Sequence, residues 1–117
     1  MPEETIEENN PILGAGAEWH SDPIRLRRGQ RAKLVVTGRR PVYAGLFKSS
    51  DYAAMRNKSG TTSKFKFGTD RATVVEEIVP DANDDYFLVV RNGVFTPRQS
   101  IRVRLSIDDS GAEPPAG

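Results

Sequence analysis

Few residues in this sequence are of types that support catalysis. The only histidine, His20, begins the run His20-Ser21-Asp22, which contains the three residue types of a hydrolase triad. Contiguous side chains in a strand or turn point in different directions, so these three cannot converge on one reacting atom. The chain has no cysteine, which excludes thiolate nucleophiles, disulfides and cysteine-ligated zinc. We therefore predict a protein that is not an enzyme, has no catalytic residue and needs no cofactor, with His20 at the surface or a strand end.

A candidate metal site is the acidic segment Asp81-Ala-Asn-Asp-Asp85. It places side-chain oxygens at alternating positions, on Asp81, Asn83 and Asp85, as at the start of a calcium-binding loop. An EF-hand loop needs glycine at the sixth position and glutamate at the twelfth, where this sequence has Tyr86 and Asn92. We predict a polar turn without a tight calcium site. A weak cation site is the alternative.

Charge is distributed unevenly along a chain whose formal net charge is only +1. The first ten residues carry four glutamates and no cation, whereas residues 25–40 carry seven cations and no anion. Nucleic-acid-binding sheets interleave exposed aromatic residues with their cations. Here Phe65, Phe67 and Phe87 fall at positions predicted to be buried. We expect the basic surface to meet an acidic protein partner or the acidic arm, and a nucleic-acid-associated function is an alternative.

Aromatic residues offer a further possibility, a platform on which sugar rings stack. The candidates are Trp19, Tyr43, Tyr52, Tyr86 and Phe95. Aromatic residues at strand ends more commonly pack in the core or at its rim. Binding of carbohydrate or a cell-wall polymer is therefore an alternative function.

The elements that must position these residues are short strands. Residues 99–107 alternate without a break: Ile101, Val103, Leu105 and Ile107 point one way, and Arg102, Arg104 and Ser106 the other. Residues 86–93 form a strand that ends in Asn-Gly, a strong turn signal. We expect these two segments to be a strand pair that closes the domain. One face of the pair should be apolar and buried, and the other basic and exposed to solvent.

The whole chain predicts the all-β class. Seven to eight short strands, at intervals of roughly 8–12 residues, indicate a single antiparallel β-sandwich of jelly-roll or immunoglobulin-like type. Ser49 or Ser50 can cap the one expected helix, near residues 50–56. A hydrophobic content of 37% suffices for one core. The predicted core residues are Leu26, Leu34, Val36, Leu46, Phe65, Phe67, Leu88, Val90, Ile101, Val103 and Leu105.

We divide the chain into a flexible acidic arm (1–16), the sandwich (17–107) and a flexible polar tail (108–117). The start Met-Pro-Glu-Glu lacks the basic and apolar regions of a signal peptide, so we expect synthesis in the cytoplasm. No apolar run approaches the roughly 18–20 residues that cross a bilayer, so no membrane insertion is expected.

One pattern resembles known families. The turn, the strand Tyr86-Phe-Leu-Val-Val-Arg-Asn and the closing strand Ile101–Ile107 look like the end of small jelly-roll modules of the bacterial pre-peptidase C-terminal and Golgi-dynamics (GOLD) types. The segments Ile24-Arg-Leu-Arg-Arg-Gly-Gln and Val42–Tyr52 fit the same layout. The resemblance covers roughly residues 23–107. It implies an accessory domain that binds proteins, lipids or polymers rather than a catalyst.

The sequence thus favours a non-catalytic module that acts as an accessory or structural subunit of a larger protein assembly, for example a phage decoration or tail component associated with the virion. We expect the acidic arm to dock on another protein rather than to serve folding. The predicted partner-binding residues are Glu3, Glu4, Ile6, Glu7, Glu8, Leu13, Arg25, Arg27, Lys64, Lys66, Arg102 and Arg104.

Overall fold

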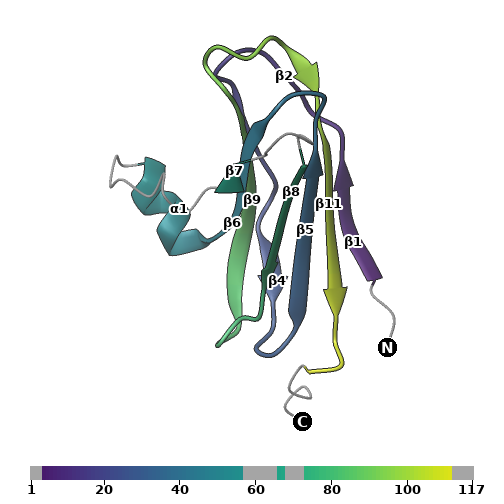
Figure 1. The fold of residues 1–117 in the computed structure, drawn as a ribbon. Helices are drawn as coiled ribbons and strands as arrows, with labels where there is room; N and C mark the ends of the chain where they lie inside the picture. Colours follow the sequence, from purple (N-terminus) through teal and green to yellow (C-terminus); the bar gives the residue numbers. More distant parts are fainter. Residues whose placement is uncertain (1–3, 57–65, 68–72, 112–117) are drawn as a thin grey trace.

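The computed structural model describes residues 4–56, 66–67 and 73–111, and they form two main β-sheets packed face to face and one short two-stranded sheet (Figure 1). The strands in chain order are β1 (Glu4–Asn9), β2 (Ile12–Leu13), β3 (Glu18–His20), β4 (Ile24–Leu26), β5 (Arg31–Thr37), β6 (Val42–Lys48), β7 (Lys66–Phe67), β8 (Thr73–Ile78), β9 (Asp84–Asn92), β10 (Gln99–Ser100) and β11 (Arg102–Asp108). One helix, α1 (Ser49–Arg56), follows β6. The all-β class and the helix near 50–56 are confirmed.

The strand order is that of a jelly roll. One sheet has the order β1-β11-β5-β8, the other has β3-β9-β6-β7, and β10 pairs with β2. Both β3 and β4 pair with β9, so together they form one interrupted edge strand. The β2–β10 pair continues the register of β1–β11, so β2 counts with β1 and β10 with β11. If β3 and β4 together are strand 2, the two main sheets have the orders 1-8-3-6 and 2-7-4-5, and every pairing among the described residues is antiparallel. This is two interlocked Greek keys, the jelly-roll alternative rather than the immunoglobulin-like one.

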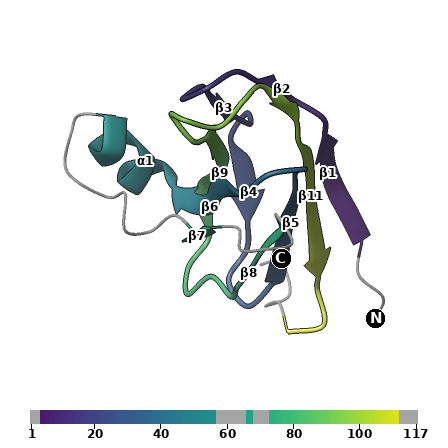
Figure 2. The same ribbon diagram turned by 45° about the horizontal axis from the view of Figure 1, so that its top comes forward.

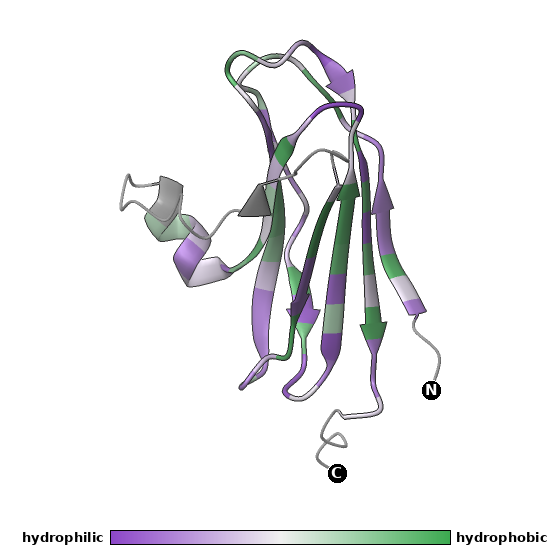
Figure 3. Ribbon diagram, viewed as in Figure 1, coloured by the Kyte–Doolittle hydropathy of each residue, from purple (hydrophilic) through white to green (hydrophobic). Residues whose placement is uncertain are grey.

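The core lies between the two sheets. Alternating apolar residues turn inward from both, and Figure 3 shows the resulting green bands along β5, β9 and β11. The predicted core residues that are confirmed as buried are Leu26, Leu34, Val36, Leu46, Leu88, Val90, Ile101, Val103 and Leu105. Phe65 and the side chain of Phe67 lie outside the described residues.

A smaller apolar cluster lies on the outer face of the second sheet. There Phe47 and Val89 are buried beneath Tyr52 of α1, and Phe87 packs against them. Figure 2 shows α1 lying outside β6, away from the first sheet. The helix therefore covers the second sheet, whereas the outer face of the first presents the arginines of β11.

The expected pairing of the last two long strands is wrong. The strand that ends at Asn92 and the strand that begins at Arg102 belong to different sheets. The sequence Asn92-Gly93 therefore does not close a hairpin but starts a connection that crosses from one sheet to the other. The physical reason is that Asn92 is fully buried and its side-chain amide bonds to the loop backbone.

The expectation of an arm without structure is also wrong for the described part of residues 1–16. β1 pairs antiparallel with β11 along Glu4–Asn9, with a bulge between Thr5 and Glu7. The Glu8 carboxylate accepts a hydrogen bond from Arg102 at 3.1 Å, and this bond is the main reason that its pKa lies below the ordinary value. Leu13 is buried in the core. The segment is thus an edge strand of its own sandwich.

Leu88→Ala tests the inward assignment of β9. Leu88 is fully buried, so we expect the truncation to lower the free energy of unfolding by about 2–5 kcal/mol. Val75→Ala, at a strand position that is 54% exposed, should change it by less than about 0.5 kcal/mol. Urea unfolding of both variants measures the difference, and equal stabilities would show that the two faces are assigned wrongly.

Deletion of residues 1–16 tests whether β1 serves folding. The deletion removes Leu13 from the core and uncovers the edge of β11, so we expect a loss of more than about 2 kcal/mol of stability. Glu8→Gln, which removes the exposed ion pairs with Arg102 and Arg104 and keeps the strand, should have a much smaller effect. Thermal unfolding distinguishes the two, and an unchanged melting temperature after the deletion would favour the original hypothesis of an arm that docks elsewhere.

Candidate interaction site at the loop end of the sandwich

The residues predicted to bind a partner do not form one surface. Glu8 lies within 3.1 Å of Arg102 and 3.8 Å of Arg104, on the outer face of the first sheet. Arg25 and Arg27 lie on and beside β4, an edge strand of the second sheet, and each faces an aspartate. These five charged residues of the predicted set are therefore paired within the molecule.

The remaining members of the predicted set are scattered. Glu7 and Glu4 are in β1 and Leu13 is in the core, so the apolar part of the arm is divided between surface and interior. Ile6 is only 37% exposed. Glu3, Lys64 and the side chain of Lys66 lie outside the described residues.

The side-chain oxygens of the acidic segment after β8 already interact with donor groups of the protein itself. Asp81 lies 3.6 Å from the Lys48 ammonium and Asp85 lies 3.5 Å from Arg25. The Asn83 side-chain oxygen accepts a hydrogen bond from the backbone N–H of Arg28 at 2.8 Å. The three oxygens therefore point at three different groups, and among the described residues no group of three potential ligands converges on a metal position.

His20 and Ser21 serve local structure. Nδ1 of His20 donates to the Ser21 carbonyl at 2.8 Å, and the ring packs against Tyr52 and Phe87 with centroid distances of 5.5 and 5.9 Å. The buried Ser21 hydroxyl donates to the Asp22 carbonyl and accepts from the Leu88 N–H. The three neighbours do not form a hydrogen-bonded relay from Asp22 through His20 to the Ser21 hydroxyl.

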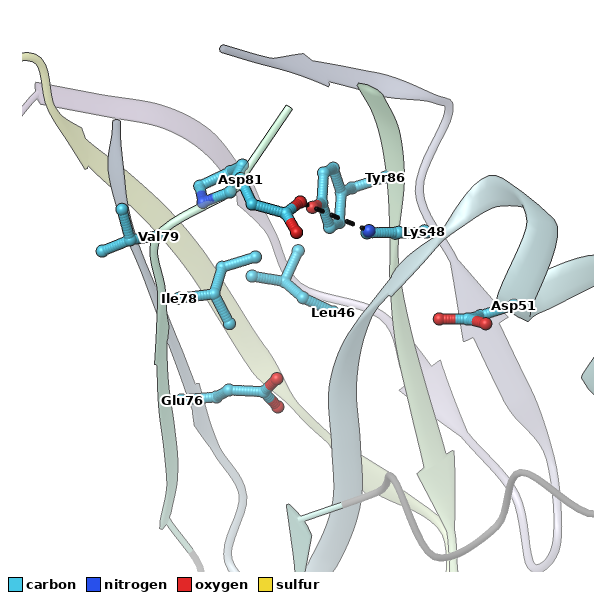
Figure 4. A pocket seen from close by; sticks show the side chains of 9 residues that line it. Leu46, Lys48, Asp51, Glu76, Ile78, Val79, Asp81 and Tyr86 are labelled. Carbon is cyan, nitrogen blue, oxygen red and sulfur yellow. Dashed lines mark ion pairs between the residues drawn. The ribbon is translucent and has the colours of Figure 1, made fainter. Parts of the chain in front are cut away.

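An open cleft of about 500 Å³ lies between β8 and β6 (Figure 4). Its floor is apolar, with Leu46 and Ile78, and Glu76 points toward it from β8. At its rim Lys48 lies beside Asp81, which raises the pKa of the Lys48 ammonium above its ordinary value. Burial raises the pKa of the neighbouring Tyr86 hydroxyl. Both shifts strengthen the protonated form, so neither Lys48 nor Tyr86 is shifted toward acting as a base near neutral pH.

A more distinctive arrangement lies at the end of the sandwich where three connections meet, at the top of Figure 1. They are residues 14–17 between β2 and β3, residues 38–41 between β5 and β6, and residues 93–98 between β9 and β10. The Gly16 N–H donates to the Gly93 carbonyl, and the Asn92 N–H donates to the Ala17 carbonyl. We call this region the loop end.

Asn92 joins the first and third of these connections. Its side-chain nitrogen lies 3.1 Å from the carbonyl oxygens of both Leu13 and Gly14. The same nitrogen lies 3.2 Å from the Thr96 carbonyl and 3.1 Å from that of Pro97. Two amide protons are therefore shared among four backbone acceptors, which holds two distant segments against one side chain.

Gln99 brings in the second connection. Its Nε2 donates to the side-chain oxygen of Asn92 at 3.0 Å, so the two buried amides form a direct pair. Its Oε1 accepts from the backbone N–H groups of Arg39 and Arg40 at 2.9 and 3.0 Å. A side chain at Gly38 would lie 2.6 Å from that same oxygen, so only glycine allows this approach.

The loop end exposes apolar side chains on this fixed backbone. Phe95 is 99% exposed and Val94 is 69% exposed, and Ile12 of β2 is 60% exposed. Figure 3 shows the hydrophobic colouring at the tip of the connection between β9 and β10. Exposed apolar patches commonly mark interaction surfaces.

The same end is cationic. Arg39, Arg40 and Arg98 are exposed, and within the described ranges none of them lies in an ion pair. Residues 10–16, 37–41 and 93–101 contain these three cations and no carboxylate. The loop end thus combines exposed apolar side chains with three arginines that form no ion pair within the described residues.

The loop end was missed in the sequence because its polar anchors look like turn residues. Asn92 precedes glycine, which indicates a turn, and Gln99 begins a strand where a polar residue attracts no notice. Phe95 was named only as one of several aromatic candidates for sugar stacking. The available signal was an isolated aromatic residue in a segment rich in turn formers, Asn92–Pro97.

Comparison with protein-family models and with curated proteins gives no match to this sequence. The resemblance to pre-peptidase C-terminal and GOLD modules stays a prediction. The described residues also contain no helix with the length and apolarity needed to cross a bilayer.

Asn92→Ala tests whether the buried amide organises the loop end. The variant leaves buried carbonyls and the Gln99 amide without their partner, so we expect a loss of about 1–3 kcal/mol of stability. Amide hydrogen exchange at Thr96 and Arg40 should also become faster than in the wild type. Asn10→Ala, at an exposed asparagine, is the matched control, and equal behaviour of the two variants would contradict the assignment.

Proposed function

We propose that this protein is a non-catalytic interaction module that docks on a larger protein assembly through its loop end. The observation that carries the proposal is Phe95, which is 99% exposed on a connection whose backbone is held by a buried hydrogen-bond network. A rigid aromatic side chain loses little conformational freedom on binding. Burial of such a side chain in a partner pocket contributes about 1.5–3 kcal/mol.

The surroundings of Phe95 also fit a protein partner. Interface hot spots are enriched in aromatic residues and arginine, with an apolar centre and a polar rim. Val94 and Ile12 extend the apolar centre, and Arg39 and Arg98 are cationic residues of the same end. Docking on other proteins in this way is the function of an accessory subunit of a larger assembly, such as a phage decoration or tail component.

A carbohydrate-binding function is a second candidate, favoured by a polar cleft of about 290 Å³ between the edge strands β1 and β3. It is lined by Glu7, Asn9, Trp19, His20, Ser21 and Asp22. Trp19 is only partly exposed because it packs against the core, and Tyr52 and Tyr86 are buried. The aromatic residues that would stack on a sugar are therefore mostly engaged elsewhere.

A nucleic-acid function through residues 25–40 receives less support. Arg25, Arg27 and Arg31 each lie within 3.5 Å of a carboxylate, so that part of the basic run is largely neutralised. The run also divides between the two ends of the sandwich, since Arg39 and Arg40 belong to the loop end. Non-specific binding of phosphates needs a continuous cationic track.

Phe95→Ala tests the proposal once the partner is identified. A photoreactive phenylalanine analogue at position 95, introduced in the source cells, would crosslink the partner, which is then purified. We expect Phe95→Ala to weaken binding of that partner about tenfold or more with unchanged thermal stability, because the side chain is exposed in the free protein.

Val75→Ala, also at an exposed apolar position, is the matched control and should bind normally. Equal affinity of the wild type and Phe95→Ala would contradict docking through the loop end. Sugar binding that is lost in Trp19→Ala and kept in Phe95→Ala would favour the carbohydrate candidate instead.

A further inference from the structure

We propose that a cleft at the loop end, on the same connection as Phe95, binds the carboxylates of an acidic segment on the partner protein, an inference that rests on the proposed function. The cleft has a volume of about 420 Å³ and lies between the connections 38–41 and 93–98. It is lined by Arg39, Arg40, Pro97, Arg98, Gln99 and Ser100. Its dimensions suit one or two extended side chains rather than a whole folded element.

Charge identifies the ligand as an anion. Among the described residues, the other arginines of both sheets are matched: Arg91 lies 3.0 Å from Glu18, and Arg31 lies 3.3 Å from Glu77. The lining of this cleft has three arginines and no acidic residue. An anionic group therefore enters without displacing an internal carboxylate.

The geometry favours planar oxyanions. Arginine presents a rigid fork of N–H donors that pairs with carboxylate in a bidentate way. The backbone at Arg39 and Arg40 is fixed by two hydrogen bonds to Gln99, so two of the three forks project from a fixed loop. Binding to these arginines therefore costs less conformational entropy of the backbone than binding to cations on a mobile tail.

The apolar neighbours favour a protein over a nucleic acid. Single-stranded nucleic acids bind where several aromatic side chains stack successive bases, and the described part of this end exposes one, Phe95, together with the aliphatic Val94 and Ile12. The net charge of +1 provides no long-range field for a polyanion. An anionic membrane is also less suitable, because adsorption through charge usually needs clusters of four to eight cations.

The test compares two triple variants with the same change in charge. Arg39→Gln/Arg40→Gln/Arg98→Gln removes the cations of the cleft, and Arg25→Gln/Arg27→Gln/Arg31→Gln removes three at the other end. The probe is an oligoglutamate peptide with apolar residues at one end, and its affinity for the full chain is measured by fluorescence titration. Amide chemical shifts locate its site.

We expect the cleft variant to bind the peptide at least about tenfold more weakly than the wild type, and the control variant to lose less than about twofold. Shifts should concentrate at Arg40, Arg98 and Ser100, and binding should weaken at raised salt. Equal losses in both variants would overturn the inference. So would tighter binding of a single-stranded oligonucleotide or of phosphatidylserine vesicles through the same three arginines.

The outcomes separate this inference from the proposed function. If the partner crosslinked at position 95 binds the cleft variant as tightly as the wild type, the carboxylate site is wrong and docking through Phe95 stands. If Phe95→Ala also leaves partner binding unchanged, the proposed function fails as well. Thermal unfolding of the cleft variant checks that its fold is intact, which we expect because these guanidinium groups make no described ion pair.

Discussion

The hydrogen bond between the buried amides of Asn92 and Gln99 is the interaction on which the loop end depends. A jelly roll brings connections from remote parts of the chain to one end, where their backbone groups need partners away from the sheets. Here one pair of side chains provides these partners: Asn92 bonds to carbonyls on both sides of the end, and Gln99 bonds to the amides of Arg39 and Arg40. Inside a protein such a network is strong when fully bonded and costly when one member is missing. The exposed tip at Phe95 is therefore held by the interior of the molecule.

The fold could be predicted from period-two alternation, and the strand pairing could not. Val103 and Leu105 of β11 are buried and Arg102 is exposed, as alternation requires, because a strand with one face on a core has only one stable register. Alternation does not say which strand is the neighbour. The partners of β11 are β1 and β5, and the first of these has the sequence of an acidic arm. The acidic segment can form a strand because Glu8 forms ion pairs with Arg102 and Arg104 on the neighbouring strand, β11.

The distribution of charge along the sequence was a poor guide to the proposed site for a related reason. The run from Arg25 to Arg40 looks uniform, but the chain reverses within it, so its first part faces aspartates and its last part does not. The partners Asp85 and Asp109 are 60 and 82 residues away along the chain. Only the three-dimensional arrangement separates cations that are neutralised from cations that are available. The last two arginines of this run, Arg39 and Arg40, line one cleft with Arg98, which is far from both in the sequence.

The edges of the first sheet explain why binding is expected at the loop end rather than by addition of a strand. An unpaired edge recruits another strand unless a bulge, a charge or a cover prevents it. β1 has a bulge between Thr5 and Glu7, and after it Glu7 lies opposite Leu105, on the inward side. β8, the other edge, places Glu76 opposite Leu34 in the same way. An incoming strand would have to bury these carboxylates at both edges. Binding through Phe95 and the arginine-lined cleft has no such cost, because these side chains lie on connections outside the sheets, which hydrogen bonds at Gly93, Thr96 and Pro97 and at Arg39 and Arg40 hold in place.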